Sequence, residues 1–197
     1  MANVDSPFGL KPLEYLSGAP WNGQARRYYI ASGYATAVYI GDPMVLAGSA
    51  DTEGKYPTVE KATLADGNLT IGPVVAFEPI ASDPNLNIIY HPASKAQYCW
   101  VADDPKLIFE IQMDSATDLA ATDVGCNGIM VETHSGSTTT GLSGIEADES
   151  DFTNGDASNM LLLLGLVDRP DNELATHCKV KVLISPTVHQ YAVGTGA

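Results

Sequence analysis

The chain has 197 residues and a formal net charge of −14, with 24 Asp or Glu residues against 10 Lys or Arg residues. Nucleic-acid binding needs cations that neutralise phosphates, so this charge disfavours direct contact with DNA or RNA. The longest apolar run, residues 160–167, is far shorter than the about 20 residues that a membrane-spanning helix needs. We therefore expect neither a nucleic acid nor a membrane as partner.

Residues 1–20 are rich in proline and glycine, and their apolar side chains are scattered. A segment of this composition cannot close a core of its own. We predict an extended N-terminal arm that packs on its own body or on a neighbouring subunit. Because the strand signals begin only after this segment, we expect the body, residues 21–197, to fold without it. The proline and glycine residues are Pro7, Gly9, Pro12, Gly18 and Pro20.

From Trp21 onward, short runs rich in β-branched and aromatic residues recur, separated by turn residues. The pairs Asp42-Pro43 and Asp104-Pro105 mark turns or strand starts, because proline fixes φ and has no N–H to donate. The pattern predicts an all-β fold, a barrel or sandwich of short antiparallel strands that follows the extended arm. The expected strands are residues 27–31, 37–40, 44–47, 58–61, 70–77, 87–90, 97–101, 107–113, 161–167, 179–185 and 188–193.

Four segments carry more specific predictions. Residues 160–167 are consecutively aliphatic, which predicts a central strand covered on both faces. Residues 179–182 alternate Lys and Val, so one face of that strand should meet water. Residues 115–121, with Ser115 as N-cap and Gly125 beyond the end, predict one short helix. Residues 135–158 are polar and then acidic, and predict a long exposed loop.

The cysteines and the N-terminus favour a reducing compartment. Cys99, Cys126 and Cys178 are odd in number and far apart, which favours isolated buried thiols over a disulfide framework. Residues 1–7 have neither a basic start nor an apolar run, so we expect no signal peptide.

Residues that could bind metal lack the necessary spacing. The histidines share no pattern such as His-x-x-x-His, so ordinary surface or core roles are favoured over a metal site. Residues 148–156 have the composition of a calcium loop, but Ser150 and Phe152 stand where an EF-hand has ligands. Adventitious calcium at these carboxylates stays an alternative. The histidines are His91, His134, His177 and His189.

Catalytic motifs are also missing from the sequence. Ser143 lies in Gly-Leu-Ser-Gly, which is not the Gly-x-Ser-x-Gly elbow of hydrolases. A carboxylate pair for glycosidic chemistry could come from four acidic residues, but an acidic β-protein offers such pairs in structural roles as well. We therefore expect no enzyme, no cofactor and no metal ion. The four acidic residues are Asp103, Asp104, Glu110 and Asp114.

Several short segments, spread over nearly the whole chain, resemble virion proteins of tailed bacteriophages. They are residues 3–12, 21–23, 28–30, 40–43, 103–105, 109–112, 122–125, 165–167 and 170–172. Within that group the chain is similar to capsid decoration, or cement, proteins, which bind the outside of the head shell and stabilise it. The segments are structural turns and strands, so they indicate a family without naming a reaction.

The resemblance implies a partner and a location. The partner would be the major capsid protein, and the site of action the outer surface of the capsid, after synthesis in the host bacterial cytoplasm. It also implies a homo-oligomer. A trimer is favoured because it matches the local threefold positions of an icosahedral shell, and a dimer stays an alternative.

The candidate partner interface combines the arm with the residues that follow it. Aromatic and arginine side chains typically anchor protein interfaces. The alternative for Trp21 and Tyr29 is that they seal one end of the barrel. The candidate residues are Phe8, Leu10, Leu13, Trp21, Arg26, Arg27, Tyr28 and Tyr29.

Two other functions remain open at this point. One is a minor head–tail or fibre-associated β-domain, which would be present in few copies per particle. The other is a glycan-binding virion module, which would need an exposed aromatic platform beside carboxylates.

Overall fold

The computed structural model describes residues 3–114, 119–152 and 156–197. Its regular structure is nearly all β, which confirms the predicted fold class. The strands are β1 (Lys11–Tyr15), β2 (Arg26–Ile30), β3 (Pro43–Ala50), β4 (Pro57–Lys61), β5 (Gly72–Phe77), β6 (Gln97–Val101), β7 (Leu107–Gln112), β8 (Asn127–Gly128), β9 (Met130–Glu132), β10 (Ile145–Ala147), β11 (Leu161–Leu166) and β12 (Lys179–Ile184). Short 3₁₀ turns, η1 (Ala121–Asp123) and η2 (Glu149–Asp151), and a one-turn helix, α1 (Gln190–Val193), complete it.

Five strands close a small barrel in the order β2-β4-β3-β5-β6. Neighbouring strands are antiparallel, except that β2 meets β4 in parallel where Tyr29 pairs with Thr58. The barrel has its own apolar core, because alternate residues of each strand point inward. That core consists of Tyr28, Ile30, Val38, Met44, Val59, Ile71, Val74, Cys99 and Val101.

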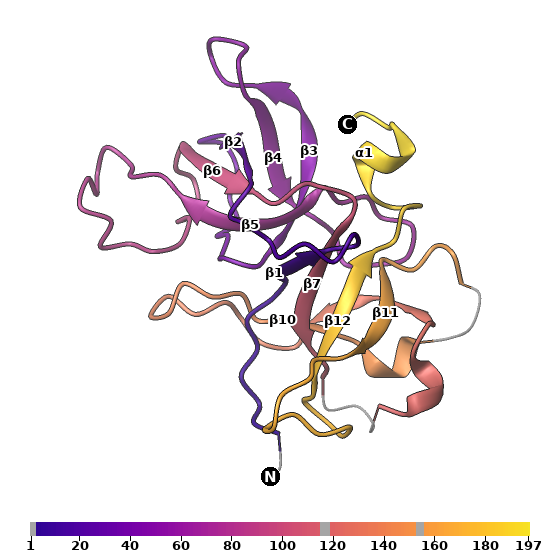
Figure 1. Ribbon diagram of the computed structural model, residues 1–197. Helices are drawn as coiled ribbons and strands as arrows, with labels where there is room; N and C mark the ends of the chain where they lie inside the picture. The colour runs from indigo at the N-terminus through magenta and orange to yellow at the C-terminus, as the bar shows by residue number, and fades with distance from the viewer. Residues whose placement is uncertain (1–2, 115–118, 153–155) are drawn as a thin grey trace.

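The second unit is an antiparallel sheet in the order β1-β7-β12-β11-β8. Phe109, Val182 and Leu163 lie in one register row and are buried on the same face. A hairpin of β9 and β10 adds Met130, Ile145 and Ala147 to the same core. Figure 1 shows the barrel strands at one end of the molecule and the sheet, with β10 beside it, at the other.

The N-terminal segment packs on its own body, which is one of the two placements expected for it. Residues 11–15 form β1, which pairs with β7 at the edge of the sheet. Proline is tolerated on an edge strand, because its missing N–H does not remove a hydrogen bond between two central strands, so Pro12 fits this position. Leu10 is buried in the sheet core. The segment is therefore part of the sheet, and the expectation that residues 21–197 fold without it stays a prediction, against which the burial of Leu10 and the pairing of β1 argue.

The segment crosses the barrel at a close backbone contact. The Leu10 N–H donates to the Gly41 carbonyl at 3.0 Å. Gly41 has φ +97°, and a Cβ at this position would lie 2.3 Å from the Phe8 carbonyl oxygen. The next residue, Asp42, accepts from the Tyr39 N–H at 2.8 Å and from the Ser143 hydroxyl at 2.6 Å. The Gly-Asp-Pro turn thus joins the N-terminal segment to the barrel.

The strand predicted at residues 160–167 is β11, which pairs with β12 on one side and β8 on the other. Only one of its faces is fully covered: Leu161 and Leu163 are buried, whereas Leu162 and Leu164 are half-buried. Among the described strands of more than three residues, β7 is the one buried along its whole length; the three-residue strand β10 is buried throughout as well. The predicted alternation in β12 is confirmed, with Val180 and Val182 buried between half-buried lysines.

Five other predictions are corrected in part. Residues 188–193 form no strand but contain α1, and residues 37–40 and 87–90 lie outside the strands, with only isolated bridges at Val38 and Ile40 in the first of these ranges. Most of the helix predicted at residues 115–121 lies outside the described residues, and η1 follows at Ala121–Asp123. The loop predicted at residues 135–158 is not exposed throughout, because residues 143–147 are buried and include β10. Residues 153–155 of that loop lie outside the described residues.

The three cysteines are free and buried, as predicted. Among the helices of the described ranges, none has the length and apolar character needed to cross a membrane.

Candidate interaction surface

The residues predicted to contact a partner lie in five different environments. Two of them are in the cores and are corrected here: Leu10 and Tyr28 are each 1% exposed. Tyr28 points into the barrel, where its hydroxyl donates to Asp103 Oδ2 at 2.6 Å. Leu13 is half-buried on β1. The other five candidates reach the surface at three separate places.

Arg27 forms the centre of a rigid aromatic cluster on the outside of the barrel. Its Nε and Nη2 atoms donate to the two carboxylate oxygens of Glu78, each at 2.6 Å. The guanidinium carbon lies 3.9 Å from the ring centroid of Tyr98 and 4.6 Å from that of Tyr56. Tyr29 packs against Tyr98 with 5.2 Å between ring centroids. A guanidinium held on both sides in this way loses little further freedom when a partner docks.

Arg26 points to a different, polar hollow. Its side chain is 71% exposed, and its Nε atom lies 3.5 Å from Asp103 Oδ2. Burial raises the pKa of Asp103, while the hydrogen bond from Tyr28 and the charge of Arg26 act in the opposite direction. The Tyr28 hydroxyl also shares a 2.7 Å hydrogen bond with that of Tyr191. This network joins the barrel to the C-terminal segment. We therefore infer that Arg26 has a structural role.

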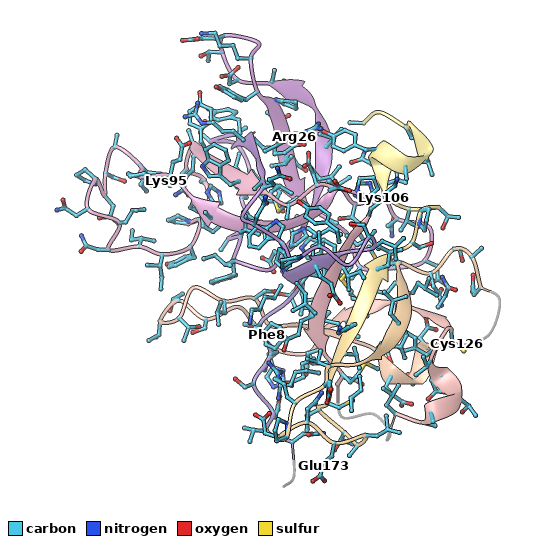
Figure 2. All side chains as sticks on the ribbon, viewed as in Figure 1. Phe8, Arg26, Lys95, Lys106, Cys126 and Glu173 are labelled. Carbon is cyan, nitrogen blue, oxygen red and sulfur yellow. The ribbon has the colours of Figure 1, made fainter. Side chains whose placement is uncertain are left out.

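Phe8 and Trp21 line an apolar groove of about 550 Å³. Both side chains are half-buried, and the Trp21 indole N–H donates to the Gln24 carbonyl at 3.0 Å. Figure 2 shows Phe8 on the N-terminal segment, well apart from Arg26. The lining comes from both units of the fold: Ser6, Phe8, Leu10, Lys11, Pro12, Trp21, Ile40, Val74, Val75, Glu110, Leu142, Arg169 and Lys179.

One end of this groove carries charged side chains. The Glu110 carboxylate is almost fully buried and accepts from Arg169 Nη2 at 2.6 Å. Lys11 Nζ lies 3.7 Å from the same carboxylate. Lys179 adds a third cation to the lining. The lining thus holds three cations and one carboxylate, and Asp171, outside the lining, lies 4.0 Å from Arg169 Nε.

Several residues of this surface were missed by sequence reasoning. Sequence reasoning could have identified Tyr98. The alternation in β6 buries Cys99 and Val101, and so turns Tyr98 outward together with Trp100. Tyr56, Glu78 and Leu142 lie in loops or at strand ends, and no local pattern connects them with Arg27 or Trp21.

The groups considered for catalysis have structural partners. Ser143 is 2% exposed and donates its hydroxyl to the buried Asp42. Asp103 and Glu110, two of the four carboxylates considered for glycosidic chemistry, pair with Arg26 and Arg169 in separate hollows. The surface therefore offers apolar and cationic contacts for binding another molecule.

Comparisons of the chain with protein-family models, curated proteins and solved structures give no match.

Proposed function

We propose that this chain is a structural protein of a tailed-bacteriophage virion that binds the outer surface of the capsid and stabilises the shell. Its partner is the major capsid protein, and it acts as a homo-oligomer, a trimer in preference to a dimer. The resemblance of its turns and strands to virion proteins supports this assignment. One of the segments that carry the resemblance has a structural role in the fold. Residues 40–43 form the turn at which the N-terminal segment crosses the barrel.

The observation that carries the proposal is the apolar groove lined by Phe8 and Trp21. Interfaces are typically anchored by a few aromatic side chains that become fully desolvated on binding. Both rings are half-buried, so docking would remove their remaining surface from water. The groove is built on the N-terminal segment, the sheet and the barrel together, so an occupant would brace both units of the fold.

The charged end of the groove indicates the chemistry of its occupant. Lys11, Arg169 and Lys179 outnumber Glu110 there, so a carboxylate is favoured over a cation. We therefore infer that the occupant is a segment of the capsid protein with an apolar side chain close to an Asp or Glu. The Arg27 cluster is a second contact candidate, because its guanidinium is already fixed by Glu78.

Co-sedimentation with capsids that lack this protein tests the proposal. The intact protein should pellet with the capsids, and Trp21→Ala should weaken binding by about 2 kcal/mol, or about thirtyfold in Kd. Trp100→Ala is the matched control, because Trp100 is 37% exposed on β6 and does not line the groove. Failure of the intact protein to bind capsids contradicts the capsid role. Equal losses in the two variants contradict the role of the groove.

A further inference from the structure

A cluster of metal-ligating side chains lies apart from the interaction surface. Asp5, Glu146 and His177 each place one ligand atom within 4.8 Å of the other two. They come from the N-terminal segment, from β10 and from the loop before β12. Figure 2 labels Glu173, in that last loop, at the end of the molecule where the N-terminal segment begins. Hydrogen bonds from Asn3 Nδ2 to the Glu173 and Thr176 carbonyls, each at 2.9 Å, fix the two segments together.

A second imidazole lies beside the cluster. His134 Nδ1 lies 3.2 Å from Glu146 Oε2, and His134 Nε2 lies 3.5 Å from Asp5 Oδ2, so its two nitrogens face different carboxylates. Within the cluster itself, His177 Nδ1 lies 3.7 Å from Asp5 Oδ1. Ligand atoms around a tetrahedral Zn²⁺ with bonds of about 2.1 Å are separated by about 3.4 Å, which is close to this distance.

Neighbouring polar groups hold the two carboxylates in place. Gln112 Nε2 donates to Asp5 Oδ1 at 3.0 Å and to Glu146 Oε1 at 2.8 Å. The Thr133 hydroxyl donates to Glu146 Oε2. Gln112 is 0% exposed and Glu146 is 1% exposed, so their positions are fixed by the surrounding core. Hydrogen bonds of this kind orient the ligands of protein metal sites.

The electrostatics of the cluster favour a cation. A buried carboxylate is costly unless an opposite charge or hydrogen bonds compensate it. In the described part of the chain, the ion-pair partners of Asp5 and Glu146 are imidazoles, and neither carboxylate pairs with Lys or Arg. Hydrogen bonds from Gln112 and Thr133 compensate the buried Glu146, and the Asp5 side chain is 41% exposed. A divalent ion would therefore add a permanent positive charge between two carboxylates whose ionic partners within the described ranges are imidazoles.

His177 provides an independent indication. Its Nδ1 atom is buried and has no hydrogen-bond partner within the described ranges. Its backbone has φ +56°, a conformation that a residue other than glycine adopts rarely. The ring is thus held with an unpaired nitrogen facing Asp5, as a metal ligand would be.

We propose that Asp5, Glu146 and His177 bind one Zn²⁺ ion, with His134 beside the site. Mixed imidazole and carboxylate ligands suit Zn²⁺, whereas Ca²⁺ and Mg²⁺ prefer oxygen ligands alone. The ion would connect Asp5 to β10 and to the loop before β12, which are more than a hundred residues away in the sequence. It would thereby hold the N-terminal segment against the body. None of these ligands lines the groove, although Ser6, the neighbour of Asp5, does. The zinc site does not depend on the proposed function. It replaces the expectation of no metal ion.

Zn²⁺ titration of chelator-treated protein, followed by calorimetry, tests the site. The protein should bind one Zn²⁺ per chain and unfold at a higher temperature when loaded. The double variant Asp5→Asn/His177→Asn should weaken binding at least tenfold. Asparagine is chosen at position 177 because it tolerates a positive φ. Circular dichroism of the metal-free variant checks that its β-fold is intact.

Asp171→Asn is the control, because Asp171 is an exposed carboxylate outside the cluster. It should bind Zn²⁺ as the original protein does. A Co²⁺-loaded sample should show the absorption bands of a tetrahedral site with nitrogen and oxygen ligands. Absence of saturable binding overturns the proposal. So does unchanged affinity in the folded double variant, which would mark the ion as adventitious.

Discussion

Replacing Leu10 by Ala tests whether the N-terminal segment is part of the folded body. Leu10 is 1% exposed and belongs to the core of the five-stranded sheet. It is packed in that core while it also lines the groove, and close-packed neighbours relax only partly around missing atoms. Comparable Leu→Ala changes in protein cores cost about 3 kcal/mol or more. For a chain of this length, that loss lowers Tm by about 6–12 °C.

Urea denaturation followed by tryptophan fluorescence measures the effect. The midpoint should fall while the slope stays constant, since the surface exposed on unfolding is nearly unchanged. Leu16→Ala is the matched control in the same segment, because Leu16 is 55% exposed. It should change the free energy of unfolding by less than about 0.5 kcal/mol. If Leu10→Ala is as mild as this control, the segment is not integral to the sheet.

Two further predictions concern the barrel crossing and the buried histidine of the C-terminal segment. Gly41→Ala should destabilise the protein and loosen residues 6–10 in hydrogen exchange, because the new Cβ would lie 2.3 Å from the Phe8 carbonyl oxygen; unchanged exchange would refute the close contact. Burial lowers the pKa of His189 to about 4. Between about pH 6.5 and pH 4 the unfolded chain therefore binds more protons than the folded chain, and the free energy of unfolding decreases as the pH is lowered through this range. The original protein should lose about 3 kcal/mol more than His189→Phe between pH 7 and pH 4; equal losses would refute the shift.

The barrel could be predicted from sequence because its strands follow simple alternation. In β6, the buried residues Gln97, Cys99 and Val101 alternate with outward-facing Tyr98 and Trp100. The same alternation in β2 would have predicted that Tyr28 points into the barrel while its neighbours, Arg27 and Tyr29, point outward. Grouping adjacent aromatic and arginine residues as one interface ignored that consecutive side chains of a strand point to opposite faces.

The N-terminal strand could not be predicted from local pattern. Residues 11–15 contain Pro12 and resemble a linker, and their strand conformation depends on pairing with β7, far along the chain. Tertiary pairing overrides weak local preference at such an edge. The proposed zinc ligands are scattered in the same way: Asp5, Glu146 and His177 are brought together only by the fold.

The groove likewise depends on contacts between distant segments. Phe8 and Trp21 were identified as interface candidates because they are aromatic residues near the N-terminus. The other apolar residues that line the groove include Ile40 and Val74, which come from the barrel unit, and Leu142, which lies in the loop before β10. No spacing in the sequence relates these residues to one another.

A map of the intact virus particle, with the copy number of this protein counted by quantitative mass spectrometry, would decide whether the protein decorates the capsid. We expect on the order of hundreds of copies on the outer faces of the capsid, arranged around local symmetry axes, with the groove of Phe8 and Trp21 against the capsid protein. About a dozen copies or fewer, confined to the head–tail junction, the tail or the fibres, would refute a capsid decoration role.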